Sequence, residues 1–171
     1  HSNPIDGHAY KKALMSSHFF LSNETITPQN NGIVLNIARV IKHIMTSATE
    51  AELAALYIMA PEAVYIRIIL EEMGHQQPPT PVQTDNSTAH GVLTNTITPK
   101  ATKAMDMRFW WLRDREIQKQ FRWMWRQGST NLADYWTKHH PASHHKAFRP
   151  EILTPMSILK ALRKAIDAKK A

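Results

Sequence analysis

The stretch PTPVQTDNSTAHGV, at residues 79–92, decides the fold, because a strand, an acid and a helix start follow one another in it. Residues 80–84 predict a short strand, and Asp85, Asn86 and Ser87 are residue types that cap helices. Asp85 therefore lies at the carboxyl end of a strand, where open α/β sheets bind their ligands. The alternative is that Asp85 only caps the following helix.

Strands and helices are predicted on both sides of this stretch. We expect strands at 16–22, 32–41 and 121–126, and helices at 48–59, 61–74, 102–119, 131–140 and 157–171. Phe121, Trp123 and Trp125 alternate along their strand and should face the core together. This interleaving predicts an α/β (mixed α+β) domain at 1–140, followed by a basic tail at 141–171 with an amphipathic helix.

A second acid lies near the start of the helix at 48–59. Ser47 and Glu50 have the spacing of a capping box, so Glu50 has a structural explanation. Glu52 shares an apolar stripe with Leu56 and Met59, and a carboxylate on such a stripe must be paired or bound to a metal. A solvated position at the edge of the stripe is the alternative.

A third acid, Asp134, lies on the short helix after the last strand. It could simply stabilise the helix dipole three residues after an Asn131 cap. With Glu52 and Asp85, however, it gives one carboxylate on each of three elements. Convergent carboxylates suit hard divalent cations, and two such ions about 3.5–4 Å apart support phosphodiester hydrolysis. The spacing of the three acids does not itself establish that they converge in space.

Composition limits the class of protein. Ten prolines, five glycines and 43% hydrophobic residues are typical of a soluble globular protein, and the absence of cysteine excludes disulfides and thiolate metal sites. No run approaches the roughly 18 consecutive apolar residues of a membrane span, and no secretory signal opens the chain. We therefore expect an intracellular protein without a membrane segment. The chain begins with His1, which suggests a fragment or a processed product.

Charge is distributed unevenly along the chain. Residues 1–99 hold 5 Lys and Arg against 8 Asp and Glu, a net charge of −3, whereas residues 100–171 hold 16 against 6, a net charge of +10. A basic half of this kind suits a polyanion such as a nucleic acid. A solubilising surface is the alternative.

Four motifs resemble the ribonuclease H domain of copia-type retrotransposon polyproteins, over residues 1–154. They are SATEAELAAL at 47–56, PTPVQTDNSTAHGV at 79–92, TKAMDMRF at 102–109 and TNLADYWTKHHPASHH at 130–145. The resemblance implies a five-stranded mixed sheet flanked by helices. It also implies a hydrolase, an endonuclease that binds two Mg²⁺ or Mn²⁺ ions and cuts the RNA strand of RNA–DNA hybrids during reverse transcription.

The resemblance also assigns roles to residues and partners. Glu52, Asp85 and Asp134 would be catalytic metal ligands, and Asn86 and Ser87 would lie near the substrate. The partners would be an RNA–DNA hybrid and a reverse transcriptase domain of the parent polyprotein, with no membrane. The protein would then act in the cytoplasm, the nucleus or virus-like particles.

The chain departs from the family at the first catalytic acid. The family's first strand reads approximately HSDAS, whereas this chain reads HSNPIDGHA, so Asn3 takes the position of an aspartate. An amide is neutral and a poorer metal ligand than a carboxylate, and Asp6 is the acid that could substitute for it. The loop RQGSTN also lacks a histidine that some relatives have there. The alternative function is a catalytically degenerate domain that binds nucleic acid or supports a neighbouring polymerase.

Two histidine pairs, His139–His140 and His144–His145, follow the last acid. Clustered imidazoles suit zinc, although pairs in a proline-broken segment are more often solvent-exposed.

Overall fold

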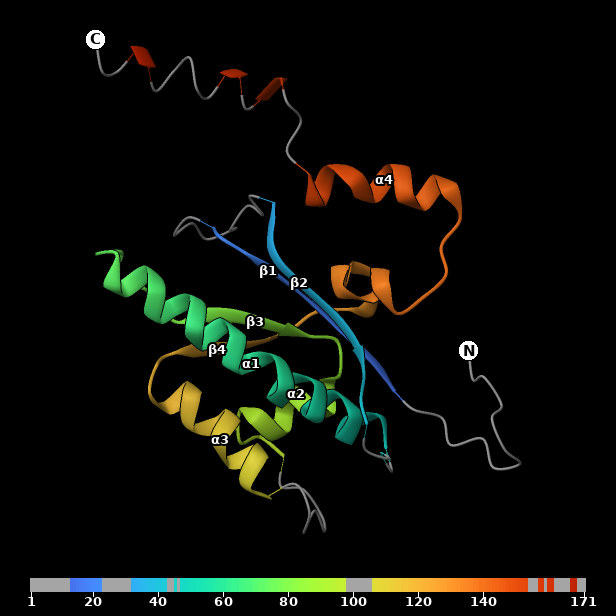
Figure 1. The fold of residues 1–171 in the computed structure, drawn as a ribbon. Coiled ribbons are helices and arrows are strands. Elements are labelled where there is room, and N and C mark those ends of the chain that lie inside the picture. The colour runs from blue at the N-terminus through green and yellow to red at the C-terminus, as the bar shows by residue number, and fades with distance from the viewer. Residues whose placement is uncertain are drawn as a thin grey trace. The chain divides into compact units, whose positions relative to one another are not determined.

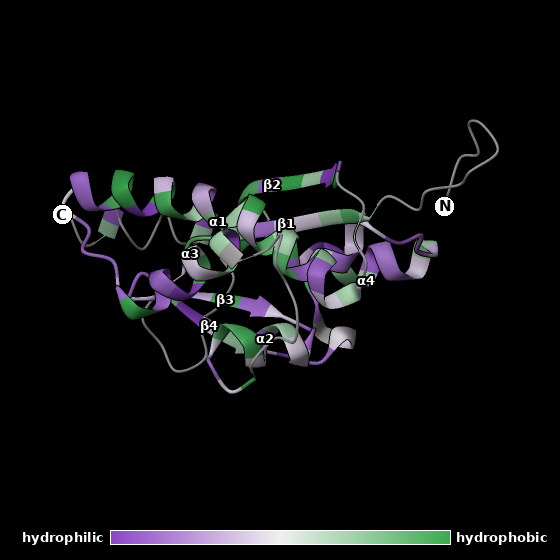
Figure 2. Ribbon diagram, turned by 90° about the horizontal axis from the view of Figure 1, so that it is seen from below, coloured by the Kyte–Doolittle hydropathy of each residue, from purple (hydrophilic) through white to green (hydrophobic). Residues whose placement is uncertain are grey.

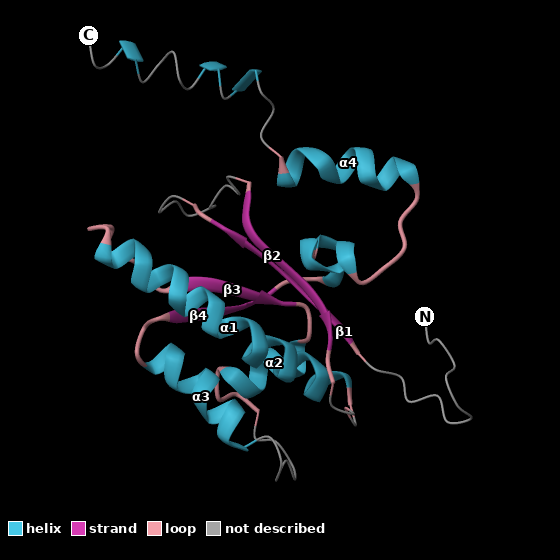
Figure 3. Cartoon of the chain, viewed as in Figure 1, coloured by secondary structure: helices cyan, strands magenta, loops and turns pink. Residues whose placement is uncertain are grey.

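The computed structural model describes residues 13–22, 32–42, 45, 47–97, 106–153, 157–158, 160–161 and 167–168 (Figure 3). These residues form a mixed α+β structure, as predicted, with four α-helices and four strands. The strands pair as two separate two-stranded sheets, β1–β2 and β3–β4, and not as the expected five-stranded sheet. Asn3 and Asp6 lie outside the described residues.

The chain divides into two compact units. One unit comprises His1–Ser17 and Ala38–Thr137, and the other comprises His18–Ile37 and Lys138–Ala171. The three predicted metal ligands all belong to the first unit.

Strands β1 (Leu14–Phe20) and β2 (Ile33–Val40) confirm the first two predicted strands. They lie side by side in Figure 1, and the amide of Ile41 donates to the carbonyl oxygen of Ala13 at 2.8 Å beyond the pair. Met15 and Ile41 are buried in the first unit. The Ser16 hydroxyl donates to the carbonyl oxygen of Ala133, so β1 borders the segment that carries Asp134.

Helix α1 (Ala48–Glu72) is one continuous helix, so the predicted division into two helices at Pro61 is wrong. Ser47 caps its N-terminus by accepting a hydrogen bond from the Glu50 amide at 3.1 Å, as the capping box predicted. Proline removes one hydrogen bond from a helix interior. Here Met59, Ala60 and Ala63 are buried on both sides of Pro61, and this shared packing carries the helix past the proline.

Helix α1 alternates between hydrophobic and hydrophilic turns (Figure 2). By length and composition alone it is apolar enough to cross a membrane, and it is the one such helix among the described residues. A core helix of a globular protein has the same properties. Here α1 contacts α2 and α3, and Leu53, Ala54, Met59 and Ala60 are buried.

Strand β3 (Thr80–Thr84) and helix α2 (Ser87–Leu93) confirm the prediction from residues 79–92. The side chain of Asn86 caps α2 by accepting a hydrogen bond from the Ala89 amide at 2.9 Å. Ala89, Val92 and Leu93 are buried and form the core face of this short helix. Because Asn86 supplies the cap, Asp85 is free of the capping role that was the alternative explanation for it.

Helix α3 (Asp106–Ile117) and strand β4 (Phe121–Trp125) complete the core of the first unit. Phe109 and Leu112 are buried, as predicted, while Met105 lies outside the described residues. Strand β4 runs parallel to β3, with Thr80 opposite Phe121 and Thr84 opposite Trp125. Because the two strands are parallel, their carboxyl ends lie at the same edge of the pair (Figure 1).

The face of β4 is only partly as predicted. Phe121 and Trp123 are 1% and 4% exposed, but Trp125 is 49% exposed, so its expected place in the core is wrong. Trp125 is the last residue of the strand. Its indole N–H instead donates to the carbonyl oxygen of Asp85 at 3.0 Å.

The final predicted short helix is the 3-10 helix η2 (Leu132–Trp136), which follows the single turn η1 (Gly128–Thr130). In the second unit, α4 (Ala142–Ile152) was missed because its sequence contains Pro150 and paired histidines. Proline lies in the last turn of α4 and leaves most of the helix intact. Phe148 is the buried residue of α4, and its ring centroid lies 6.3 Å from that of His18.

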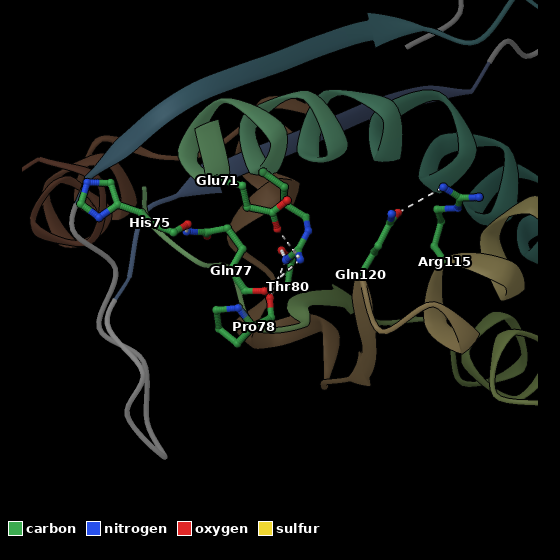
Figure 4. A network of polar contacts seen from close by, with 8 residues as sticks. Glu71, His75, Gln77, Pro78, Thr80, Arg115 and Gln120 are labelled. Atoms are coloured by element: carbon green, nitrogen blue, oxygen red, sulfur yellow. Dashed lines mark hydrogen bonds and ion pairs between the residues drawn. The ribbon is translucent and has the colours of Figure 1, made fainter. Parts of the chain in front are cut away.

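Buried Arg67 ties the second half of α1 to the start of β3. Figure 4 labels the residues that it contacts, Glu71, Gln77, Pro78 and Thr80. Its guanidinium donates to the carbonyl oxygens of Gln77, at 3.0 Å, and Pro78, and to the hydroxyl of Thr80 at 2.9 Å. It also pairs with Glu71 at 3.3 Å. These hydrogen bonds hold the segment that connects α1 to β3. They therefore help to set the path of the strand toward Asp85.

Candidate metal-binding site

Glu52 lies in the first third of α1, where its side chain reaches the end of β3. Its carboxylate oxygen Oε1 accepts a hydrogen bond of 2.6 Å from the hydroxyl of Thr84. Burial raises the pKa of Glu52 above its ordinary value of 4.5; the Thr84 hydrogen bond lowers it, and the charges of Asp85 and Asp134 raise it. Glu52 is therefore not the solvated edge residue of the alternative interpretation.

Asp85 is the first residue after β3, and two neighbours shape its surroundings. Trp125, at the end of β4, donates its indole N–H to the Asp85 backbone carbonyl and so fixes the main chain there. Gly128 approaches the side chain: a Cβ atom at Gly128 would lie 3.0 Å from Asp85 Oδ2. Glycine at this position leaves space beside the carboxylate that any larger residue would reduce.

Asp134 lies in the first turn of η2, after an Asn131 cap. The Asn131 side chain accepts from the Ala133 amide at 3.1 Å, and the amide of Asp134 donates to the Asn131 carbonyl oxygen at 3.2 Å. The N-terminal cap of η2 is therefore Asn131. A favourable interaction with the helix dipole remains compatible with this position.

Glu52 interacts electrostatically with Asp85 and with Asp134. Burial is the main cause of the raised pKa of Glu52, and the charges of Asp85 and Asp134 add to it, although the three residues lie on α1, after β3 and on η2. In the part of the chain that the structure describes, no three Asp, Glu or His side chains are already arranged as a complete metal-binding set. The three acids are therefore close enough to interact electrostatically, but in the described residues they do not form a ready metal-binding geometry.

Asn86 and Ser87, the predicted substrate contacts, follow Asp85 directly. The Asn86 carbonyl group is used as the cap of α2, and its backbone amide donates to the Thr84 hydroxyl at 3.2 Å. Ser87 is exposed at the first position of the helix. The side-chain amide nitrogen of Asn86 and the Ser87 hydroxyl are the groups that a ligand could contact.

Three residues at this edge were not predicted: Thr84, Trp125 and Gly128. Thr84 and Trp125 are paired in the parallel register of β3 and β4, so recognising the two strands as parallel neighbours would have brought Trp125 next to Asp85. Gly128 follows the last strand by three positions, where a glycine permits close approach of another segment. Thr84 carried no sequence signal except that it precedes the acid.

Basic side chains lie along β4. Arg122 and Arg126 are exposed, and the amide of Arg126 donates to the Thr84 carbonyl oxygen at 3.0 Å, which extends the pairing to the edge that carries Asp85. The backbone of Arg126 therefore lies beside the strand end that precedes Asp85.

The histidine pairs lie apart from the acids in the sequence and belong to the second unit. The rings of His140 and His144 stack with centroids 4.1 Å apart, and His144 stacks on Phe148 at 5.9 Å. These contacts order the start of α4. No zinc-binding group is found among these histidines or elsewhere in the described residues.

Comparison of the chain with protein-family models, with characterised proteins and with solved structures finds no significant match.

Proposed function

We propose that the protein is a divalent-metal-dependent ribonuclease H-like nuclease that cleaves the RNA strand of RNA–DNA hybrids. The observation that supports the proposal is the placement of Glu52: its partly buried carboxylate accepts a hydrogen bond from Thr84 at the end of β3, next to Asp85 and within electrostatic reach of Asp134. The sequence resemblance assigns these three acids to one metal site. Carboxylates that repel one another in a partly buried place raise the free energy of the metal-free protein. A bound cation relieves that repulsion.

The ligand chemistry fits Mg²⁺ or Mn²⁺. Carboxylate oxygens are the donors these ions prefer, and neither thiolates nor clustered imidazoles stand among the three acids. Glu52, Asp85 and Asp134 would hold the metal. Asn3 or Asp6 would supply the remaining position in the family's arrangement.

When bound, the ions would activate a water molecule and stabilise the departing oxygen of the phosphodiester. The residues of this chain would do the rest. Arg126 and the exposed part of Trp125 would contact the nucleic acid beside the carboxylates, the first through phosphate and the second through a sugar or base. Ser87 would contact the strand near the 2′-hydroxyl, the group that distinguishes RNA from DNA.

The family's five-stranded sheet is part of the proposal. The described residues supply two pairs of strands, of which β3–β4 is parallel with helices between, as the family's last two strands would be. The missing strand would be the first, carrying Asn3 or Asp6 and joining the pairs. The domain would span residues 1–140, with the basic tail at 141–171 outside it.

Cleavage of a labelled RNA–DNA hybrid in the presence of Mg²⁺ or Mn²⁺ tests the proposal. We expect Glu52→Gln and Asp85→Asn each to lower the rate by at least about 100-fold, because each removes a charge that the metal requires. Glu62→Gln changes a glutamate on the same helix outside the site and should leave the rate unchanged. Cleavage that survives both site changes would contradict the assignment.

Asn3 favours a second candidate, a degenerate domain that binds the hybrid without cutting it or supports a neighbouring polymerase. Loss of one carboxylate leaves the basic surface intact, so binding would persist and weaken with rising salt. Tight binding without cleavage in the natural chain, together with cleavage after Asn3→Asp, would establish this candidate. Cleavage by the unmodified chain would exclude it.

A further inference from the structure

Thr84 is a buried polar side chain at the candidate site, and its hydroxyl makes two hydrogen bonds. It is the last residue of β3 and is 2% exposed. Its hydroxyl donates to Glu52 Oε1 at 2.6 Å, a distance typical of a strong hydrogen bond from a hydroxyl to a carboxylate. The bond joins α1 to β3 across 32 residues of sequence, so it is not a product of local chain geometry.

Two further hydrogen bonds fix the position of Thr84. It accepts a hydrogen bond from the Asn86 amide at 3.2 Å, which orients the hydroxyl proton away from that amide and toward the carboxylate. The Thr84 main chain is held as well, because its carbonyl oxygen accepts from the Arg126 amide at 3.0 Å. The donor is therefore rigid, whereas glutamate has a flexible side chain.

We infer that Thr84 is a positioning residue: its buried hydroxyl fixes one oxygen of the Glu52 carboxylate and leaves the other available to a divalent cation. This inference rests on the proposed function, which makes Glu52 a metal ligand. In the part of the chain that the structure describes, Glu52 Oε2 has no hydrogen-bond donor, so the two oxygens are already distinct. Outer hydrogen bonds of this kind orient metal ligands in other proteins and typically change metal affinity by about 10- to 100-fold.

Valine matches threonine in shape but lacks the hydroxyl, while serine keeps the hydroxyl and lacks the methyl group. The pair Thr84→Val and Thr84→Ser therefore separates positioning from packing. Thr84→Ala removes the hydroxyl without adding a methyl group, and serves where the valine variant does not fold by circular dichroism. All are made in the full chain.

Two measurements are needed. Binding of Mn²⁺ alone, followed by electron paramagnetic resonance, should weaken by about tenfold in Thr84→Val and stay within about twofold of the natural chain in Thr84→Ser. In the metal-free protein, ¹³C relaxation of the Glu52 side chain should show increased motion in Thr84→Val and little change in Thr84→Ser.

The outcomes separate this inference from the proposed function. Unchanged Mn²⁺ affinity and unchanged Glu52 motion in Thr84→Val would overturn the positioning role. Equal losses in the valine and serine variants would also overturn it, since they would indicate packing. Failure of the natural chain to bind Mn²⁺ would reject the proposed function. The relaxation measurement would then still decide whether Thr84 holds Glu52.

Discussion

Glu52 shows at the scale of one residue why a carboxylate on an apolar stripe calls for a functional explanation. Burial and the charges of Asp85 and Asp134 raise its pKa, and the Thr84 hydroxyl opposes them. A residue that served only stability would not combine desolvation with like-charge neighbours. The sequence showed the stripe and the acid, but not the hydroxyl, because Thr84 lies 32 positions away on another element.

The raised pKa of Glu52 predicts how stability depends on pH. A carboxyl whose folded-state pKa exceeds its unfolded value stabilises the fold fully below the unfolded value of 4.5, and that contribution is lost as pH rises through the folded-state pKa. Glutamine carries no charge and still offers Thr84 an acceptor. We therefore expect Glu52→Gln to raise the melting temperature at pH 7 in metal-free buffer, with a smaller difference at pH 4.

Thermal unfolding followed by circular dichroism at both pH values measures this difference. The Glu62→Gln variant of the same helix is the matched control. A Glu52→Gln variant less stable than the natural chain at pH 7 would refute the electrostatic account of the site.

Gly128 gives a second prediction at this scale. A methyl group there would lie 3.0 Å from Asp85 Oδ2, so the carboxylate would have to move by a few tenths of an ångström. A displacement of about 1 Å at a reacting centre can cost about 100-fold in rate, and this smaller shift should cost less. We expect Gly128→Ala to lower Mn²⁺ affinity and hybrid cleavage by about threefold, with an unchanged melting temperature. An alanine variant with full metal affinity would mean that Asp85 is not confined.

At the scale of elements, short-range signals predicted well and long-range ones did not. Ser47, Asn86 and Asn131 were recognised as caps, and each accepts the expected hydrogen bond. Pro61 was read as a helix start, but packing on both sides of it keeps α1 continuous. Trp125 was assigned to the core by alternation alone, but its side chain at the end of β4 is half exposed and binds the Asp85 carbonyl oxygen.

The Arg67 network predicts which contact sets the junction of α1 and β3 (Figure 4). Arg67→Met keeps the aliphatic stem but removes the donors to the carbonyl oxygens of Gln77 and Pro78. Leaving such acceptors unsatisfied should lower the free energy of unfolding by about 3 kcal/mol, measured by urea denaturation.

Glu71→Gln is the control for this change. Its carboxylate is 46% exposed, so loss of the ion pair with Arg67 should cost at most about 1 kcal/mol. Equal losses in the two variants would show that the ion pair, and not the carbonyl contacts, holds the junction.

At the scale of the whole molecule, the sequence predicted the mixed α+β class and the four strands and most helices that the structure describes. Helix α4 was missed, since paired histidines and Pro150 give no clear helical signal. The assignment of Glu52, Asp85 and Asp134 to one metal site came from the resemblance and not from spacing, and it stays a prediction.

The most direct test of the central claim is anomalous diffraction from crystals of the full chain grown with Mn²⁺. The account predicts anomalous peaks between the carboxylates of Glu52, Asp85 and Asp134, with Asn3 or Asp6 beside them. Carboxylates directed to separate surfaces, with no manganese among them, would contradict it.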